Sequence, residues 1–188
     1  MWLCEVANIP EEQIESWFTS VNNYVIDNKS TSDFEVAVRK LLYIFPRCKF
    51  TGDLYRIVNL DIEQVSQDPT PQGLNRIFTE YKQTHKRNLY GWSKDLDSAE
   101  VQFLKNDPQK VGVACHQYHV GVDIGMLYDQ LKKNYPNLFI SSDAKLGFNL
   151  AKEENEVISA TSQDARVIQL YARGKTYSIQ ELSKISKL

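Results

Sequence analysis

The chain opens with two stretches in which apolar residues recur at helical spacing. The first begins at Pro10 with two acidic residues, as a helix N-terminus prefers. Its apolar positions are Ile14, Trp17, Phe18, Val21 and Val25. The second, 30–45, begins with Ser and Thr residues that can cap a helix, and it ends before Pro46. The pattern predicts two amphipathic helices, which form a helical lobe over residues 1–48.

From residue 49 onward, strand-like and helical patterns mix. Apolar, β-branched runs predict strands at 53–60, 88–93, 110–122, 156–159 and 165–172. Helical spacing predicts helices at 71–87, 94–106 and 123–134, the last with Asp123 as N-cap. Helices followed by mixed elements favour an α+β architecture. At 188 residues we expect a single domain, with the lobe at 1–48 and the core at 49–188.

Composition and charge narrow the possible partners. Formal net charge is −2, so no overall basic field gathers nucleic acid, and we expect no nucleic-acid partner. No apolar run reaches the roughly 18 residues of a membrane span, and the start lacks the pattern of a signal peptide. Three scattered cysteines form no C-x-x-C pair, which argues against a disulfide framework and a structural zinc site. We therefore expect a soluble, cytoplasmic protein with no membrane partner.

Two other motifs are weak. The "GKT" at 174–176 ends like a phosphate-binding loop, but the first glycine of such a loop would fall at Gln169. His116 and His119 are an odd number of positions apart, so a strand would send them to opposite faces. A shared metal ion is therefore not favoured, and we expect no metal site.

Three short segments, taken in order, resemble a known family. They are "LYRIVN" at 54–59, "LYGWSKDLDSAEVQF" at 89–103 and "EENEVIS" at 153–159. They resemble the Arg, Ser and Glu motifs of the mono-ADP-ribosyltransferases, over about the last three-quarters of the chain. The resemblance implies a split β-sheet core in which the motifs flank one cleft for NAD, the substrate. The family includes enzymes that bacteriophages inject into their hosts, so a phage-encoded member would act in the host cytoplasm.

The first two motifs carry the cofactor-binding candidates. Arg56 matches the arginine that holds the NAD phosphates, for which a planar guanidinium is well suited. In the second motif Gly91 stands where the family has its first serine, Trp92 follows, and Ser93 is last. The family's first serine steadies the catalytic glutamate, so Gly91 departs from the pattern, and Ser93 is the candidate substitute. Trp92 also suits a core position, and Ser93 also suits a helix N-cap for a segment beginning at Lys94.

The third motif carries the catalytic candidates. Glu154 and Glu156 are two positions apart, a spacing that places both side chains on one face of a strand. The resemblance makes Glu156 the catalytic glutamate, which hydrogen-bonds the nicotinamide ribose and stabilises the positive charge that grows as the glycosidic bond breaks. It makes Glu154 the carboxylate that orients an incoming arginine. A solvated acidic loop is the alternative for both.

The predicted function follows from the ordered set. We expect ADP-ribose transfer from NAD to an acceptor, most simply an arginine side chain of a host protein, with release of nicotinamide. The aromatic candidates for contact with nicotinamide are Tyr55, Tyr90, Trp92 and Phe103. Two alternatives stay open: an NAD glycohydrolase of the same fold, and a non-catalytic binding or inhibitor module.

Overall fold

The computed structural model divides the chain into two compact units. It describes residues 5, 9–27, 29, 32, 34–36, 38, 39, 46–85, 87, 89–104, 110–160, 163–182 and 184. Unit 1 comprises Met1–Gly52, Leu89–Gly91 and Val120–Ala160, and unit 2 comprises Asp53–Asn88, Trp92–His119 and Thr161–Leu188. Strands β1 (Lys49–Asn59), β2 (Tyr90–Ser93) and β3 (Gly112–Asp123) contribute residues to both units. Backbone pairing gives the strand order β1-β2-β4-β3-β5-β6.

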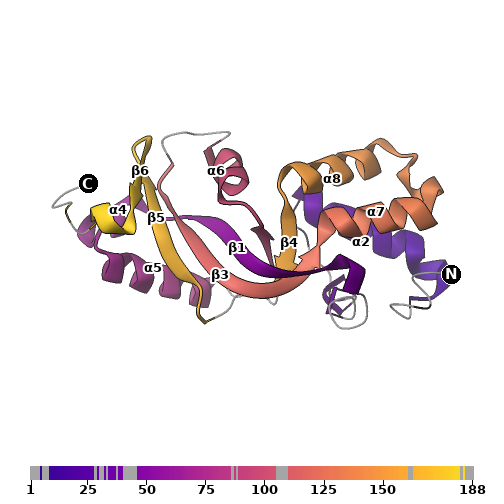
Figure 1. The fold of residues 1–188 in the computed structure, drawn as a ribbon, viewed down its shortest axis with the longest axis horizontal. Coiled ribbons are helices and arrows are strands. Elements are labelled where there is room, and N and C mark those ends of the chain that lie inside the picture. The colour runs from indigo at the N-terminus through magenta and orange to yellow at the C-terminus, as the bar shows by residue number, and fades with distance from the viewer. Residues whose placement is uncertain are drawn as a thin grey trace. The chain divides into compact units, whose positions relative to one another are not determined.

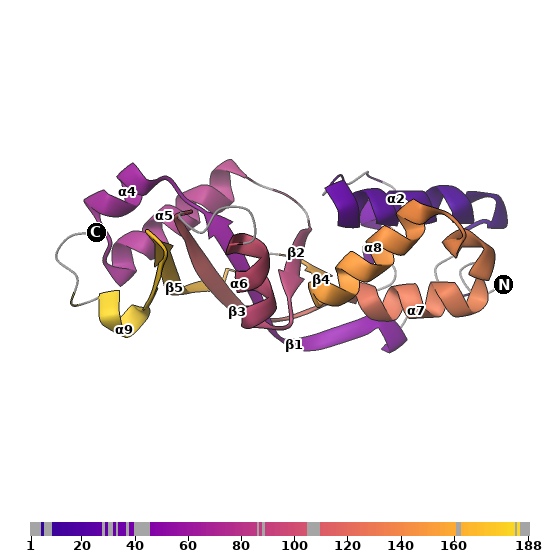
Figure 2. The same cartoon turned by 90° about the horizontal axis from the view of Figure 1, so that it is seen from above.

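Unit 1 is mainly helical. Helices α2 (Ile14–Asp27), α7 (Ile124–Asn134) and α8 (Ser142–Glu153) lie side by side (Figures 1 and 2). Short 3-10 turns accompany them: η1 (Glu11–Gln13), η2 (Pro46–Cys48) and η3 (Pro136–Phe139). Strand β4 (Glu156–Ser159) pairs antiparallel with the end of β3, with Val122 opposite Ile158. Asp123 caps α7 by accepting the N–H of Met126, as the sequence predicts.

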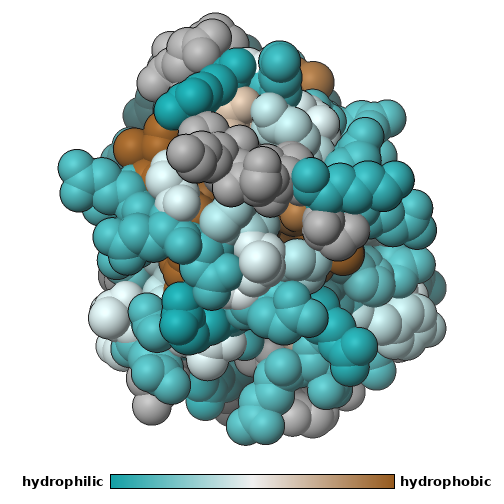
Figure 3. Space-filling model, turned by 90° about the vertical axis from the view of Figure 1, so that its left-hand side faces the viewer, coloured by the Kyte–Doolittle hydropathy of each residue, from teal (hydrophilic) through white to brown (hydrophobic). Residues whose placement is uncertain are grey.

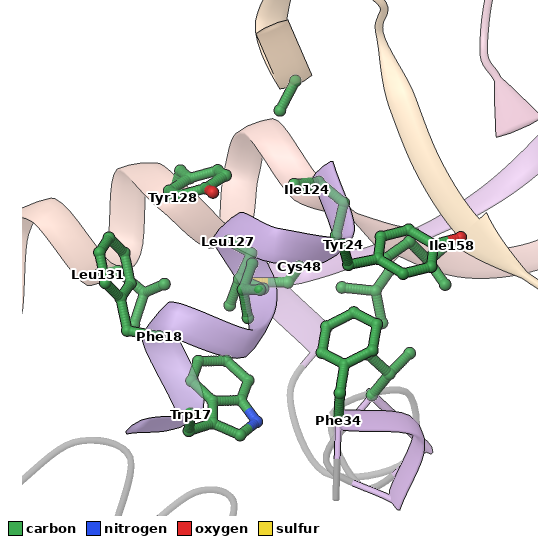
Figure 4. Close-up of a cluster of buried hydrophobic side chains, with 14 of the residues drawn as sticks. Trp17, Phe18, Tyr24, Phe34, Cys48, Ile124, Leu127, Tyr128, Leu131 and Ile158 are labelled. Carbon is green, nitrogen blue, oxygen red and sulfur yellow. The ribbon is translucent and has the colours of Figure 1, made fainter. Parts of the chain in front are cut away.

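The core of unit 1 is rich in aromatic rings. Side chains of α2, α7 and β4 meet there (Figure 4). Phe18 packs edge-on against Tyr128, with ring centroids 5.9 Å apart, and also lies 5.0 Å from Phe139. The hydroxyl of Tyr128 donates a hydrogen bond to the amide oxygen of Asn22, so the two buried polar groups satisfy each other.

Unit 2 combines paired strands with helices. Tyr55 of β1 lies opposite Ser93 of β2, β3 pairs with β5 (Arg166–Ala172), and β5 pairs with β6 (Lys175–Ser178). All of these pairings are antiparallel. The helices are α4 (Ile62–Gln67), α5 (Pro71–Thr84), α6 (Leu96–Leu104) and α9 (Ile179–Leu182). Figure 1 shows α5 and α6 on opposite sides of these strands.

The turn between β5 and β6 explains the "GKT" segment. Arg173 and Gly174 both have positive φ, 53° and 70°, as the tight turn of a β-hairpin requires. Lys175 and Thr176 then begin β6. The segment is thus a hairpin, whereas a phosphate-binding loop leads into a helix.

The secondary structure confirms most of the sequence prediction. Helices and an antiparallel sheet occur together, so the α+β class is confirmed. The five predicted strands are present, as are the helices predicted over 10–26, 71–87, 94–106 and 123–134. The sequence missed α4, α8, β6 and α9. Most of the helix predicted over 30–45 lies outside the described residues, although 32, 34–36, 38 and 39 are helical. The division at residue 48 stays a prediction.

The surface is mostly polar on the side that Figure 3 presents. Hydrophilic residues cover most of that face, and hydrophobic residues form small separate patches. Among the helices that the structure describes, none combines the length and the hydropathy needed to cross a bilayer.

Two helical glycines of unit 1 give a matched test of its packing. A Cβ at Gly147 would lie 2.5 Å from the Asn22 Oδ1 and 2.6 Å from the Tyr128 hydroxyl, two buried atoms already bonded to each other. We expect Gly147→Ala to lower the free energy of unfolding by about 1–3 kcal/mol. At Gly125 the nearest atom is 3.4 Å away, so Gly125→Ala gains about 0.5–1 kcal/mol. Urea denaturation of both variants measures the difference; equal midpoints would contradict this account of the packing.

Candidate functional site

Glu156 is a buried carboxylate at the start of β4 in unit 1. Its side chain is 9% exposed, and its Oε2 atom is fully buried. A Cβ built on Gly91 would lie 2.8 Å from Oε1 of Glu156 and 3.7 Å from the hydroxyl of Tyr24. The first position of the Ser motif therefore lies directly against the predicted catalytic glutamate. A side chain at position 91 would collide with that oxygen, so glycine is what allows the carboxylate to lie so close to the β2 backbone.

Two buried tyrosines, Tyr128 and Tyr24, lie in the same region as Glu156. Burial raises the pKa of the Tyr128 hydroxyl, and the negative charge of Glu156 raises it further. Tyr24 is 3% exposed, and its ring stacks on Phe34 with centroids 4.9 Å apart. The sequence analysis missed both residues. The available signal was a tyrosine within the apolar stripe of α7, because a buried tyrosine hydroxyl usually has a polar partner.

The prediction that Glu154 and Glu156 share one face of a strand is wrong. Helix α8 continues to Glu153, and Glu154 is its C-cap, with φ −83° and ψ −7°. Asn155 then has a positive φ of 50°, a conformation that asparagine tolerates better than most residues. The strand begins only at Glu156. The alternation of side chains along a strand therefore does not apply to this pair, and Glu154 lies half-buried on the turn between α8 and β4.

In unit 2 the Arg and Ser motifs lie on neighbouring strands. Tyr55 and Ser93 are directly opposite each other, so their side chains project from the same face of the sheet. Arg56 is the next residue along β1 and projects from the other face. Burial raises the pKa of the Cys115 thiol. The positive charges of Arg56 and of Lys82 on α5 oppose this rise, so both cations act on Cys115. The structure thus brings the motifs together but turns Arg56 away from Ser93.

Ser93 begins the turn that leads into α6. Its side chain is 6% exposed, and its Oγ accepts the backbone N–H of Asp95 at 3.1 Å. Asp95 in turn accepts the N–H of Ser98 at 3.0 Å and the Ser98 hydroxyl at 2.7 Å. The N-cap of α6 is therefore Asp95, and the alternative reading of Ser93 as the cap of a helix beginning at Lys94 is wrong.

The candidate rings differ in how far protein covers them. Trp92 is 3% exposed and Tyr90 7%, while Phe103 is 9% exposed and packs against Tyr171, with centroids 5.6 Å apart. Trp92 and Phe103 thus occupy core positions. For Trp92 this agrees with the alternative interpretation from the sequence, a core aromatic residue. Tyr55 is half-buried, and its ring lies 5.3 Å from that of His116. The Nε2 atom of His116 lies 2.7 Å from a carboxylate oxygen of Asp53.

Neither a metal-ligand cluster nor a similar known protein assigns a role to these residues. Within the part of the chain that the structure describes, no three His, Cys, Asp or Glu side chains gather as a metal site requires. No protein-family model, no curated protein and no solved structure matches this chain. The site therefore has to be interpreted from its own residues.

The cap of α6 gives a pH-dependent prediction. Hydrogen bonds from Ser98 lower the pKa of Asp95 below its ordinary 3.8. This stabilisation is present above that ordinary value and is lost as the pH falls through the lowered pKa. We expect Asp95→Ala to destabilise the protein by about 1 kcal/mol at pH 7 and by less once the pH has fallen through the lowered pKa of Asp95. Asp95→Asn keeps an acceptor at the cap, so it should retain most of the stability and lose the pH dependence. Thermal unfolding at several pH values measures both; a pH-independent loss in the alanine variant would contradict the assignment.

Proposed function

We propose that the protein transfers ADP-ribose from NAD to an arginine side chain of a protein and releases nicotinamide. The observation that carries the proposal is the contact between Gly91 and Glu156. These residues come from two motifs far apart in the sequence, and the resemblance to the mono-ADP-ribosyltransferases implies that they meet. The strands that bear the Arg, Ser and Glu motifs are also consecutive in the pairing order, β1-β2-β4. This order supports the finer fold assignment, a split sheet of that family, as part of the proposal.

Glu156 supplies the main electrostatic contribution to this chemistry. The bond between C1′ of the ribose and the nicotinamide nitrogen breaks, and nicotinamide leaves with the electron pair. The ribose then carries oxocarbenium-like positive charge. A carboxylate held beside the ribose stabilises that charge, and it does so more strongly where protein excludes water. Burial of Glu156 provides such a setting.

The remaining roles are distributed over the other candidates. A nitrogen of the acceptor arginine forms the new bond to C1′ and passes one proton to Glu154, which releases it to water. The proposal also assigns orientation of that guanidinium to Glu154. It assigns the NAD phosphates to Arg56, whose guanidinium can donate two parallel hydrogen bonds. Gly91 carries no hydroxyl, so no serine side chain at position 91 holds Glu156. Tyr55, half-buried, is the ring best exposed for contact with nicotinamide.

The catalytic assignment is tested by two isosteric substitutions three positions apart. Glu156→Gln removes the charge and keeps the shape, so nicotinamide release and protein labelling from labelled NAD should both fall by about a hundredfold or more. Glu153→Gln, at the exposed end of α8, is the matched control and should retain full activity. Equal activity of the wild type and the Glu156 variant would refute the proposal. So would an absence of both reactions in the wild type with host extract as acceptor source.

The role of Glu154 can be separated from that of Glu156. If Glu154 serves only the acceptor, Glu154→Gln should reduce labelling of arginine in protein by about tenfold or more while nicotinamide release persists. Mass spectrometry of the labelled proteins identifies the modified residue. Parallel loss of both activities would show that Glu154 acts on bond cleavage instead.

One observation favours an NAD glycohydrolase as the second candidate. Glu154 lies on a turn after α8, not beside Glu156 on a strand. If this position does not serve an arginine, water is the acceptor and free ADP-ribose is the product. Release of nicotinamide by the wild type without any label on protein would support this candidate over transfer.

A further inference from the structure

Unit 1 contains a groove that the proposed reaction does not use. It has a volume of about 630 Å³ and lies between α2, η3 and the first turns of α8. Its lining follows α2 from Glu15 to Asp27. At 1.5 Å per residue this is a length of about 18 Å. An extended peptide of about five residues, at roughly 3.3 Å each, spans the same distance.

The groove carries negative charge. Glu15, Asp27 and Asp143 line it, and none of its described lining residues is Lys or Arg. Asp27 pairs with Lys29 at 3.0 Å on the surface. The carboxylates of Glu15 and Asp143 make no ion pair with any residue that the structure describes. Two acidic side chains at the groove are thus available to a cationic ligand.

Exposed apolar side chains lie beside these acids. Ile140 is 73% exposed and Leu146 is 46% exposed, and both line the groove. Large exposed apolar side chains that gather at one groove, with a polar rim, are typical of a protein interaction site. When an apolar side chain of a partner covers Ile140 and Leu146, their apolar surface is removed from water, which favours binding.

Asn22 adds a hydrogen-bond donor to the groove. Its side chain is 6% exposed, and its amide oxygen already accepts the hydroxyl of Tyr128. Its amide nitrogen makes no hydrogen bond to any described residue, and Asn22 lines the groove. An amide N–H group donates readily to a carbonyl oxygen, so a ligand that presents such an oxygen can accept a hydrogen bond from Asn22. A peptide backbone supplies such oxygens at every residue.

We propose that this groove docks a cationic, amphipathic peptide segment of another protein. Lysine or arginine side chains of the segment pair with Glu15 and Asp143, its apolar side chains cover Leu146 and Ile140, and a backbone carbonyl accepts from Asn22. Polyanions such as nucleic acid are repelled by the acidic rim. A second copy of this chain, with a net charge of −2, offers no overall positive charge to this rim. The proposal is independent of the proposed transfer reaction, because it requires no NAD.

The test measures binding of a defined probe by fluorescence anisotropy. The probe is a fluorescein-labelled octapeptide of alternating leucine and lysine; lysine replaces arginine so that the probe is no acceptor for arginine transfer. We expect saturable binding at low salt, weakened about fivefold by each of Glu15→Gln and Asp143→Asn, and weakened further at 0.5 M salt. Glu63→Gln, an exposed acid on α4, is the matched control and should change the affinity less than twofold. Leu146→Ser should weaken binding at all salt concentrations.

Several outcomes would overturn the proposal. One is a probe affinity that is equal in the wild type and in the double variant Glu15→Gln/Asp143→Asn, with both proteins unfolding at the same temperature. Another is an equal loss in the Glu63 control, which would indicate attraction to the whole protein. A third is equally tight binding of the leucine–glutamate counterpart peptide. Self-association of the wild type that the double variant abolishes would identify a second copy as the occupant instead.

Discussion

The packing of α8 against α2 and α7 is the constraint on which unit 1 depends. At its centre the buried hydroxyl of Tyr128 donates to Asn22, and Gly147 of α8 allows the helix to approach both groups. Two polar atoms taken out of water are stable there only because they are paired. The same approach fixes the end of α8, and the chain turns at Asn155 directly into β4. The position of Glu156 is therefore a consequence of helix packing.

A buried carboxylate has to be reconciled with the cost of removing charge from water. That cost is several kcal/mol for an isolated ion, as an order of magnitude. Buried ionisable groups cluster at functional sites, and burial of Glu156 beside Gly91 makes this position a candidate for such a site. Its influence reaches Tyr128, whose pKa it helps to raise. The catalytic candidate and the interior of unit 1 are thus electrostatically coupled.

Asn22 connects the interior of unit 1 with its surface. Its amide oxygen accepts the hydroxyl of Tyr128 in the core, and the residue also lines the acidic groove. One wall of the groove is therefore formed by α2, a helix that is tied to the core through Asn22. A binding surface on a rigid element loses little conformational entropy when a ligand docks. This is a physical reason why the proposed docking site can bind a short segment through few contacts.

The sequence by itself determined the elements whose signals are local. Apolar periodicity located α2, α5 and α7, and β-branched runs located β1, β3 and β5. Asp123 marked the start of α7 as its N-cap. It also supplied the order of the Arg, Ser and Glu motifs, on which the functional hypothesis depends. It did not reveal α8, whose segment contains Gly147 and Asn149, two residues of low helix propensity, and so it misplaced Glu154 on a strand. Only the tertiary structure placed Gly91 against Glu156, turned Arg56 away from Ser93 and assembled the groove. Each of these features arises from contacts between segments that are distant in the chain, and local propensity contains no information about such contacts.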